Sequence, residues 1–194
     1  MINSGRPLIL ASGSRYRRDL LARLRLPIHA EAPDLDETAA PGESARALVQ
    51  RLARAKAMAL QDKFPGHWLL GSDQAAAAGN RILGKPGSRE AALGQLEACS
   101  GRTVEFLTAV ALVADGQVHE ALDCTTVHFR TLTRAEIERY IDAEPALDCA
   151  GSFKCEGLGI SLFERIDSQD PTGLIGLPLT AVCSLLRAAG AALP

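Results

Sequence analysis

The sequence predicts an α/β fold in which helices flank a mixed central sheet. Short apolar segments alternate with segments of helical periodicity through most of the 194 residues, which is the order expected of such a fold. Two long strand-like stretches, 103–113 and 118–132, are joined at Asp115-Gly116, a typical hairpin signal. Because this hairpin is antiparallel, we expect a mixed sheet rather than a purely parallel one.

The first third of the chain predicts two strands and two helices. An apolar run over 7–11 indicates a buried strand, and the small-residue turn 12–14 leads into a helix with a leucine stripe. A second short strand is expected over 27–30, before an acidic loop over 32–42. A long helix over 43–61 follows, because its apolar residues recur at helical spacing. These residues are Leu48, Val49, Leu52 and Ala59.

Strand patterns and capping residues predict the elements that follow. A strand over 67–74 comes before an expected turn at Gly79-Asn80. A helix over 88–99 starts with a serine suited to an N-cap. Another helix begins at Thr133, because Glu136 stands three residues later in the capping-box pattern.

The last elements complete one domain. A strand is expected over 158–163, and an amphipathic helix over 177–189 is ended by Gly190. No linker or repeat interrupts the chain, so we expect residues 1–194 to form a single domain.

Composition and charge exclude several functional classes. The chain carries 21 Lys+Arg against 23 Asp+Glu, and 4% aromatic residues, which argues against a nucleic-acid or membrane-surface protein held by bulk charge. The five cysteines are scattered without a CxxC pair, which favours reduced thiols over a disulfide framework. The N-terminus lacks a signal-peptide pattern, and no apolar run approaches the ~18 residues that span a bilayer. We therefore expect a cytoplasmic protein.

The segment 12–18, Ser-Gly-Ser-Arg-Tyr-Arg-Arg, predicts an anion-binding turn. Free N–H groups at a helix N-terminus suit phosphate, and its arginines crowd into the end of the helix dipole that disfavours cations. Arg17 lies three and four residues before Leu20 and Leu21, which turns it toward the packed face. A solvated basic helix start is the alternative; we favour an anionic partner.

Lys56 and Asp73 are the other candidate charged residues. Lys56 follows Leu52 by four residues and so lies on the apolar stripe, where snorkelling and ligand binding are equally compatible with the sequence. Asp73 follows an apolar strand, a usual place for a metal ligand or general base, although an aspartate there can also serve a turn. Asp36 and Glu37, with Asp34, supply further carboxylates, and a divalent ion on a triphosphate takes one or two of them.

Two other motifs carry weaker signals. Residues 79–85 match GxxxxGK, but Pro86 stands where a phosphate-binding loop has Ser or Thr, so we reject that motif and interpret its apolar interior as a strand. Lys85 stays a candidate cation, because Gly84 and Pro86 fix the backbone around it. The segment 149–157 holds two cysteines without a nearby histidine, which favours structural thiols over a nucleophile.

Five segments, in this order, resemble the Maf family of nucleotide pyrophosphatases over almost the whole chain. They are 8–21 (LILASGSRYRRDLL), Asp36-Glu37, 51–57 (RLARAKA), 71–74 (GSDQ) and 84–86 (GKP). The resemblance implies hydrolysis of the bond between the α- and β-phosphates of a nucleoside triphosphate, with a divalent metal cation, Mg²⁺ or Mn²⁺. It also implies a Maf/ITPase-like α/β fold with two lobes around a deep cleft, and a cytoplasmic location. A homodimer is left open beside a monomer.

Three features resemble the branch of the family that acts on 7-methyl-GTP. They are Gln74, the segment 149–157 and Gly176-Leu-Pro178. The branch acting on dTTP and UTP instead has Thr at the position of Gln74 and Gln at that of Glu156. Tyr16 departs from the Trp typical of the 7-methyl-GTP branch, and Gly13 replaces a common Thr.

The implied reaction gives each candidate residue a role. Asp73 is expected to activate or orient the attacking water or to hold the metal, with Glu37 as the second metal carboxylate. Glu156 would accept hydrogen bonds from guanine N–H groups, Tyr16 would stack on a cationic methylated purine, and Gln74 would contact the base. The phosphate-binding residues are Ser12, Ser14, Arg17, Lys56 and Lys85.

Other functions stay open at this point. A nucleotide-binding regulator of septum formation and cell division need only bind, so the joint presence of Asp73 and Glu37 favours an enzyme. A pyrophosphatase for another modified purine, or for dTTP and UTP, is a second alternative.

Overall fold

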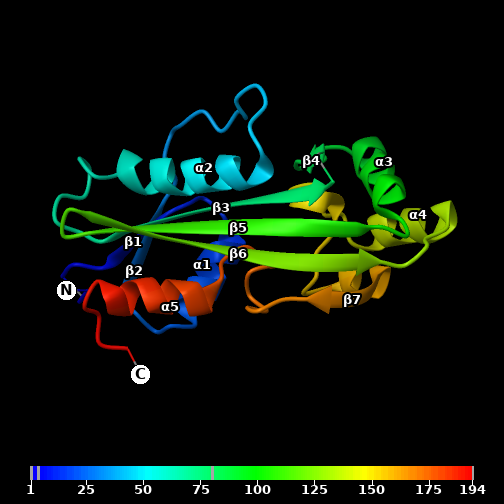
Figure 1. The fold of residues 1–194 in the computed structure, drawn as a ribbon. Coiled ribbons are helices and arrows are strands. Elements are labelled where there is room, and N and C mark those ends of the chain that lie inside the picture. Colours follow the sequence, from blue (N-terminus) through cyan, green and yellow to red (C-terminus); the bar gives the residue numbers. More distant parts are fainter. Residues whose placement is uncertain (1, 4, 80, 194) are drawn as a thin grey trace. The chain divides into compact units, whose positions relative to one another are not determined.

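The computed structural model describes residues 2–3, 5–79 and 81–193 (Figure 1). Within them one sheet of seven strands has the order β2-β1-β3-β5-β6-β7, with β4 paired to β3. The strands are β1 (Leu8–Ala11), β2 (Ile28–Glu31), β3 (Leu69–Ala78), β4 (Arg81–Leu83), β5 (Thr103–Ala114), β6 (Gln117–Phe129) and β7 (Phe163–Asp167). The helices are α1 (Arg15–Ala22), α2 (Ala45–Ala59), α3 (Arg89–Cys99), α4 (Arg134–Ala143) and α5 (Leu179–Ala188), with 3₁₀ turns η1 (Ala150–Ser152) and η2 (Leu158–Leu162).

The strand directions confirm the mixed sheet. Strand β1 is parallel to both β2 and β3, whereas β4 is antiparallel to β3 and β7 to β6. Asp115 and Gly116, between β5 and β6, have φ of +48° and +80°. Two successive positive φ values are those of a type I′ turn, so the expected hairpin is also confirmed.

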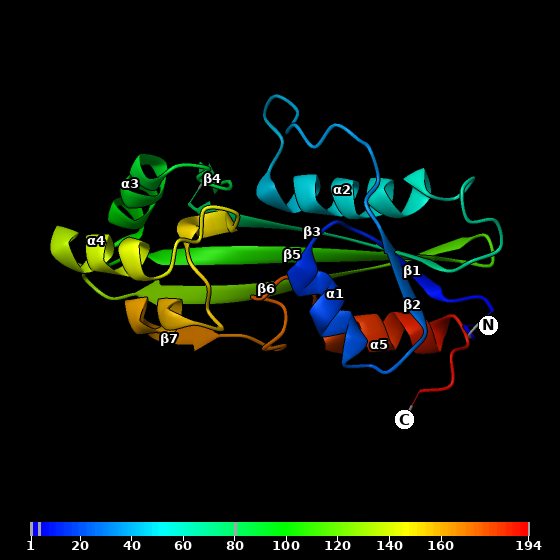
Figure 2. The ribbon, with the colours of Figure 1, turned by 180° about the vertical axis from the view of Figure 1, so that it is seen from behind.

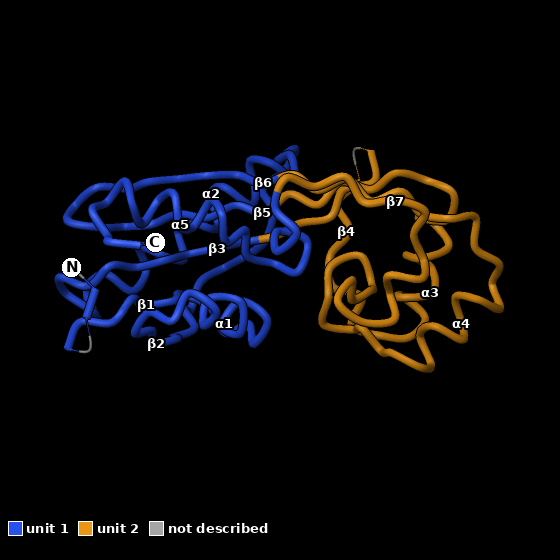
Figure 3. Tube along the Cα trace, turned by 90° about the horizontal axis from the view of Figure 1, so that it is seen from below, with its two compact units in different colours: residues 1–73, 108–123, 170–194 blue, residues 74–107, 124–169 orange. Residues whose placement is uncertain are grey.

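The chain divides into two compact units (Figure 3). Unit 1 holds Met1–Asp73, Thr108–Asp123 and Asp170–Pro194, and unit 2 holds Gln74–Leu107 and Cys124–Gln169. The strands β3, β5 and β6 contribute residues to both units.

Unit 1 is a three-layer sandwich (Figures 1 and 2). Leu8 and Leu10 of β1 join the core formed with α1 and α5, while Ile9 and Ala11 join the core under α2. Alternate side chains of a strand point to opposite faces, and here both faces are buried. This explains why the first strand is apolar throughout, as is typical of parallel strands covered on both sides.

Unit 2 is built around phenylalanines. The rings of Phe106, Phe129, Phe153 and Phe163 meet edge to face, with centroids 4.7–5.7 Å apart, the arrangement that aromatic quadrupoles favour. Helices α3 and α4 lie beside each other in this unit (Figures 1 and 2). The capping box predicted for the second of them is present: Thr133 Oγ1 accepts from the Glu136 N–H, and the Glu136 carboxylate accepts from the Thr133 N–H.

The predicted strand over 158–163 is wrong. Residues 158–162 form η2 instead, and β7 begins at Phe163. Leu158 and Ile160, which would share one face of the predicted strand, are 47% and 53% exposed. A Cβ on Gly159 would overlap the Lys154 carbonyl, so the chain folds back on itself here, and such close approach is available only to glycine.

Smaller differences concern element ends. β3 continues to Ala78 rather than ending at residue 74, because Ala76–Ala78 pair with β4. β6 ends at Phe129 rather than 132. The predicted turn at Gly79-Asn80 lies partly outside the described residues; Gly79 has φ +57°. No helix in the described part of the chain is long and apolar enough to span a bilayer.

Candidate active site

A buried lysine in unit 1 is the centre of the site. The Lys56 side chain is 6% exposed, and its ammonium donates to Asp73 Oδ1 at 2.7 Å and pairs with Glu37 Oε1 at 2.8 Å. Of the two interpretations that the helix pattern left open, snorkelling to solvent does not describe this lysine. Its charge is instead balanced by two carboxylates that lie seventeen and nineteen residues away in sequence.

Close packing of α2 on β3 makes this contact geometrically available. A Cβ on Gly71 would overlap the Ala53 carbonyl and approach the Ala57 amide nitrogen to 2.7 Å. The helix backbone on both sides of Lys56 therefore lies directly against the strand, at a position two residues before Asp73. Glycine at this position brings the lysine and the aspartate within hydrogen-bond distance.

Asp73 lies inside β3 rather than at its end. The interpretation of this residue as a strand-end or turn aspartate is therefore wrong, because the small residues after it continue the strand into the pairing with β4. Its side chain is 10% exposed. A buried carboxylate is costly unless it is paired and hydrogen-bonded, and Lys56 provides that pairing.

Arg17 and the serines before it form the second part of the site. Ser14 is the N-cap of α1, accepting from the Arg17 N–H, and its own N–H donates to Ser12 Oγ at 3.1 Å. The Arg17 guanidinium donates from Nε to the Gly176 carbonyl at 2.9 Å and from Nη1 to Ser12 Oγ at 3.4 Å. Arg17 is half-buried while Arg15 and Arg18 are exposed, which confirms the inward orientation that the helix pattern predicted.

The charge of Arg17 interacts with the two carboxylates that surround Lys56. Burial lowers the pKa of Arg17, and the charges of Asp73 and Glu37 act in the opposite direction. Arginine stays protonated at any physiological pH. Two cations and two carboxylates therefore share one partly buried region of unit 1, a setting in which charges interact far more strongly than in water.

Tyr16 stands next to this region with a cation on its ring. The Arg15 guanidinium carbon lies 4.8 Å from the ring centroid, and Arg15 Nη2 donates to the Tyr16 hydroxyl at 2.8 Å. Tyr16 is half-buried. Its ring face thus lies against a positive planar group, a cation–π contact.

The other predicted residues belong to unit 2. Gln74 is half-buried in β3, Lys85 is exposed after β4, and Glu156 is exposed before η2. Cys155 Sγ lies 3.5 Å from Glu156 Oε2 as a donor. Burial and then the Glu156 carboxylate raise the pKa of Cys155 to about 12, so this thiol is protonated and inert at neutral pH.

Comparison with known proteins identifies the family of this chain. A family model described as Maf-like protein matches residues 7–189. The chain belongs to the Maf family. Full-length relatives named 7-methyl-GTP pyrophosphatase include one from Xanthomonas oryzae pv. oryzae, 59% identical over 96% of this chain and 98% of its own length. Another, from Pseudomonas fluorescens, is 53% identical over 97% of this chain and 99% of its own.

A solved structure supports the fold alone. It is described as the structure of the Staphylococcus aureus Ham1 protein, and it matches 93% of this chain and 96% of that chain with a TM-score of 0.50 at 13% identity. This likeness confirms the expected class, a mixed α/β sheet with flanking helices.

The donor set around Lys56 is of a kind that fits a divalent cation. Among the described residues there is no group of three or more His, Cys, Asp or Glu side chains able to hold a metal. Glu37 and Asp73 nevertheless both reach one cation, the Lys56 ammonium. Mg²⁺ commonly takes one or two carboxylates and completes its shell with phosphate oxygens and water, so these two residues suit that kind of site.

Residues of the 170–176 turn were missed by sequence reasoning. The Gly176 carbonyl accepts from Arg17 Nε and, at 3.4 Å, from the fully buried Ser72 hydroxyl. Asp170 anchors the turn by accepting from the N–H and hydroxyl groups of Thr172 and Thr180. Burial acts to raise the pKa of Asp170, but these hydrogen bonds outweigh it and the pKa is lowered. In the sequence, only 176–178 gives a signal here, through its resemblance to the 7-methyl-GTP branch of the family.

Proposed function

We propose that this protein is a nucleoside triphosphate pyrophosphatase that converts 7-methyl-GTP to 7-methyl-GMP and pyrophosphate. The observation that carries the proposal is the buried Lys56 ammonium between Asp73 and Glu37, in a chain whose full-length relatives bear the name of that enzyme. Buried charges of this kind are a usual mark of a functional site, since they add little net stability.

In the proposed reaction, three cationic side chains bind the triphosphate. Lys56 and Arg17 would each exchange a carboxylate or hydroxyl contact for phosphate oxygens, and Lys85 would add a third charge. Ser12 and Ser14, with the N-terminus of α1, supply neutral donors. Stabilising the charge that develops on the leaving pyrophosphate is a main source of rate enhancement in such reactions.

Asp73 is the proposed base. When Lys56 turns to the phosphates, the Asp73 carboxylate is freed to accept a proton from a water molecule that attacks phosphorus. The new P–O bond forms as the bridging P–O bond between the α- and β-phosphates breaks, and pyrophosphate leaves. A divalent cation held by Glu37 and Asp73 would supply further positive charge to the phosphate oxygens.

Base recognition is proposed for three residues on the strength of the family resemblance. Glu156 would accept from the N1–H and exocyclic N–H of guanine, Gln74 would contact the base, and Tyr16 would stack on the cationic ring. The cation that already lies over the Tyr16 ring supports the last of these roles.

The proposal also covers domain organisation, cellular location and oligomeric state. We propose one functional domain over residues 1–194, since the family match runs through residues of both units. A cytoplasmic setting is supported by five free thiols. A homodimer is the assembly to test by light scattering.

The test is an assay of the purified protein with 7-methyl-GTP and Mg²⁺ that detects pyrophosphate and phosphate separately. Pyrophosphate with 7-methyl-GMP is expected, and 7-methyl-GTP should have a higher kcat/KM than GTP, dTTP or UTP. Phosphate release would indicate cleavage at the γ-phosphate and contradict the proposal. Tight nucleotide binding without any turnover would favour the regulator instead, and a higher kcat/KM for another base would reassign the substrate.

A further inference from the structure

Arg51 fastens the loop that carries Glu37. From α2, its Nε donates to Glu43 Oε1 at 2.7 Å and its Nη2 to Glu43 Oε2 at 2.8 Å. The same Nη2 donates to the Thr38 carbonyl at 3.1 Å. Thr38 is the residue directly after Glu37, so one guanidinium ties both the end of the loop and the neighbour of Glu37 to the helix.

The loop is closed internally around the same glutamate. Glu43 Oε2 also accepts from the Ala40 N–H at 2.9 Å, and the Glu43 N–H donates to the Ala40 carbonyl at 3.0 Å. The hydrogen bond from Arg51, followed by that from Ala40, lowers the pKa of Glu43 to about 2. Both partners are therefore charged throughout the physiological range, and the bidentate geometry is of the strong kind.

Glu37 needs such a restraint. Its side chain is 56% exposed, and an exposed carboxylate on a loop holds its geometry weakly through a single ion pair. A carboxylate that shares a metal with Asp73 must instead be held to within about half an ångström.

We propose that Arg51 and Glu43 are positioning residues that fix Glu37 as the second metal carboxylate. This inference rests on the metal role given to Glu37 in the proposed function. In this role neither residue contacts the substrate; both act through the backbone that follows Glu37, at Thr38 and Ala40. Partners that orient metal ligands in this way commonly change metal affinity by roughly 10- to 100-fold.

The test compares Arg51→Gln and Glu43→Gln with a matched control, Arg54→Gln. Arg54 lies on the same helix and is exposed, and its pairing with Glu120 is 3.9 Å long. At saturating nucleotide, the Mg²⁺ concentration for half-maximal pyrophosphate release should rise about tenfold in both test variants. The maximal rate at saturating Mg²⁺ should change much less, and the control should match the wild type.

A double-mutant cycle and a binding readout separate positioning from a general loss of structure. In the Glu37→Gln background, Arg51→Gln should add no further change in metal dependence, since its route of action is already removed. Mn²⁺ titration by electron paramagnetic resonance, with an α,β-methylene triphosphate analogue bound, should show the same tenfold weakening without turnover.

The outcomes also separate this inference from the function beneath it. Wild-type metal dependence in both Arg51→Gln and Glu43→Gln, or full additivity with Glu37→Gln, would overturn the positioning role while the enzyme assignment stands. A wild-type protein that releases no pyrophosphate would instead remove the proposed function. If Arg51→Gln lowers the melting temperature sharply, Glu43→Gln and the Mn²⁺ titration decide the question.

Discussion

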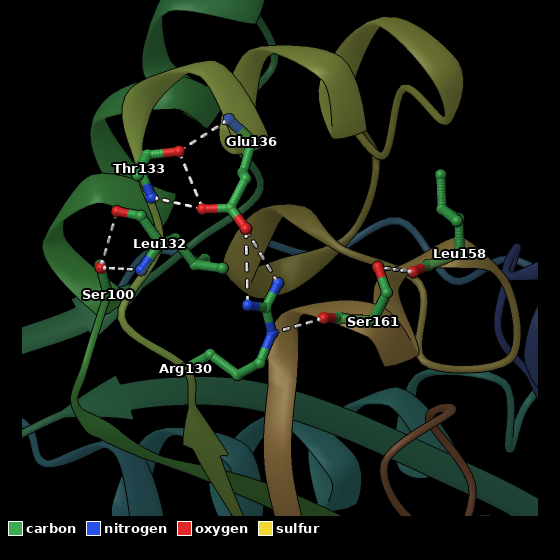
Figure 4. A network of polar contacts seen from close by, with 7 residues as sticks. All are labelled: Ser100, Arg130, Leu132, Thr133, Glu136, Leu158 and Ser161. Carbon is green, nitrogen blue, oxygen red and sulfur yellow. Dashed lines mark hydrogen bonds and ion pairs between the residues drawn. The ribbon is translucent and has the colours of Figure 1, made fainter.

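A polar cluster in unit 1 and a polar network in unit 2 differ in burial and in the groups they join. In unit 1, the side chains of Lys56 and Asp73 are almost fully buried and form an ion pair with each other. In unit 2, a larger network of polar groups lies near the start of α4, where Arg130 contacts Glu136 and the Ser161 carbonyl, and Ser100 exchanges hydrogen bonds with Leu132 (Figure 4). The side chains of Arg130 and Glu136 are 39% and 29% exposed.

The difference teaches what each network is for. The hydrogen bonds drawn in Figure 4 end mostly on backbone groups at helix and strand ends, which stabilises local structure. Burying an ion pair, by contrast, costs desolvation energy, and the attraction between the two charges often does no more than offset that cost. The unit 1 cluster is therefore poorly explained by stability and well explained by chemistry.

Asp73→Asn should have the largest effect and tests that interpretation most directly. The amide keeps the size and a hydrogen-bond acceptor for Lys56, which also keeps its contact with Glu37, so the fold should persist. Loss of the base or metal carboxylate should lower kcat by ~10²-fold or more. Asp142→Asn in unit 2, which loses only an exposed pair with Arg89, is the control and should match the wild type in kcat. Near-normal turnover by Asp73→Asn would remove this residue from the reaction.

Lys56→Met should come next, with a loss shared by all substrates. A lost charged contact to phosphate is worth roughly 1.5–3 kcal/mol, or about 10- to 150-fold in kcat/KM, whatever the base. The melting temperature should also fall, because Asp73 is left buried without its ammonium partner. Lys63→Met, an exposed lysine paired with Glu31, is the matched control. Unchanged kinetic constants in Lys56→Met would reduce this lysine to a structural role.

Local sequence signals predicted much of this arrangement. The Thr133–Glu136 capping box, the hairpin at Asp115-Gly116 and the inward face of Arg17 depend on residues within a few positions of one another, and all three are confirmed. The unusual position of Lys56 on an apolar stripe was likewise visible, although its partners were not.

Contacts between distant segments were beyond such signals. That Gly71 must lack a Cβ depends on where α2 lies, and the acceptor for Arg17 is a backbone carbonyl 159 residues away. A strand was predicted over 158–163, whereas residues 158–162 form a 3₁₀ turn in which Gly159 lies against the Lys154 backbone. Hydrophobic periodicity indicates which side chains are buried. It does not indicate where two distant segments of backbone approach each other, and these contacts depend on that approach.

Glu156→Gln should sharpen the comparison by separating base choice from chemistry. An amide offers guanine one carbonyl where a carboxylate offers two oxygens, so kcat/KM for 7-methyl-GTP should fall by about 10- to 100-fold, the scale of one charged hydrogen bond. Values for dTTP and UTP should hold or rise, with GTP measured alongside. Glu164→Gln, an exposed glutamate in β7, should leave all four unchanged. A uniform fall across the four nucleotides would place Glu156 with the phosphates or the metal and withdraw the 7-methyl-GTP preference.

The smallest effects come from two helix caps of the same chemistry, one in each unit. Thr133 caps α4 and Ser14 caps α1, each through its hydroxyl oxygen. Replacing either by alanine should cost about 1 kcal/mol, a fall of about 2–4 °C in melting temperature for a chain of this length. Thr133→Ala should leave kcat/KM for 7-methyl-GTP at the wild-type value, because its network serves only local structure. Ser14→Ala should lower it as well, since the same hydroxyl is proposed to meet phosphate. Equal losses of activity in the two variants would show that the polar network at the start of α4 also serves the reaction, and its contrast with the Lys56 cluster would fail.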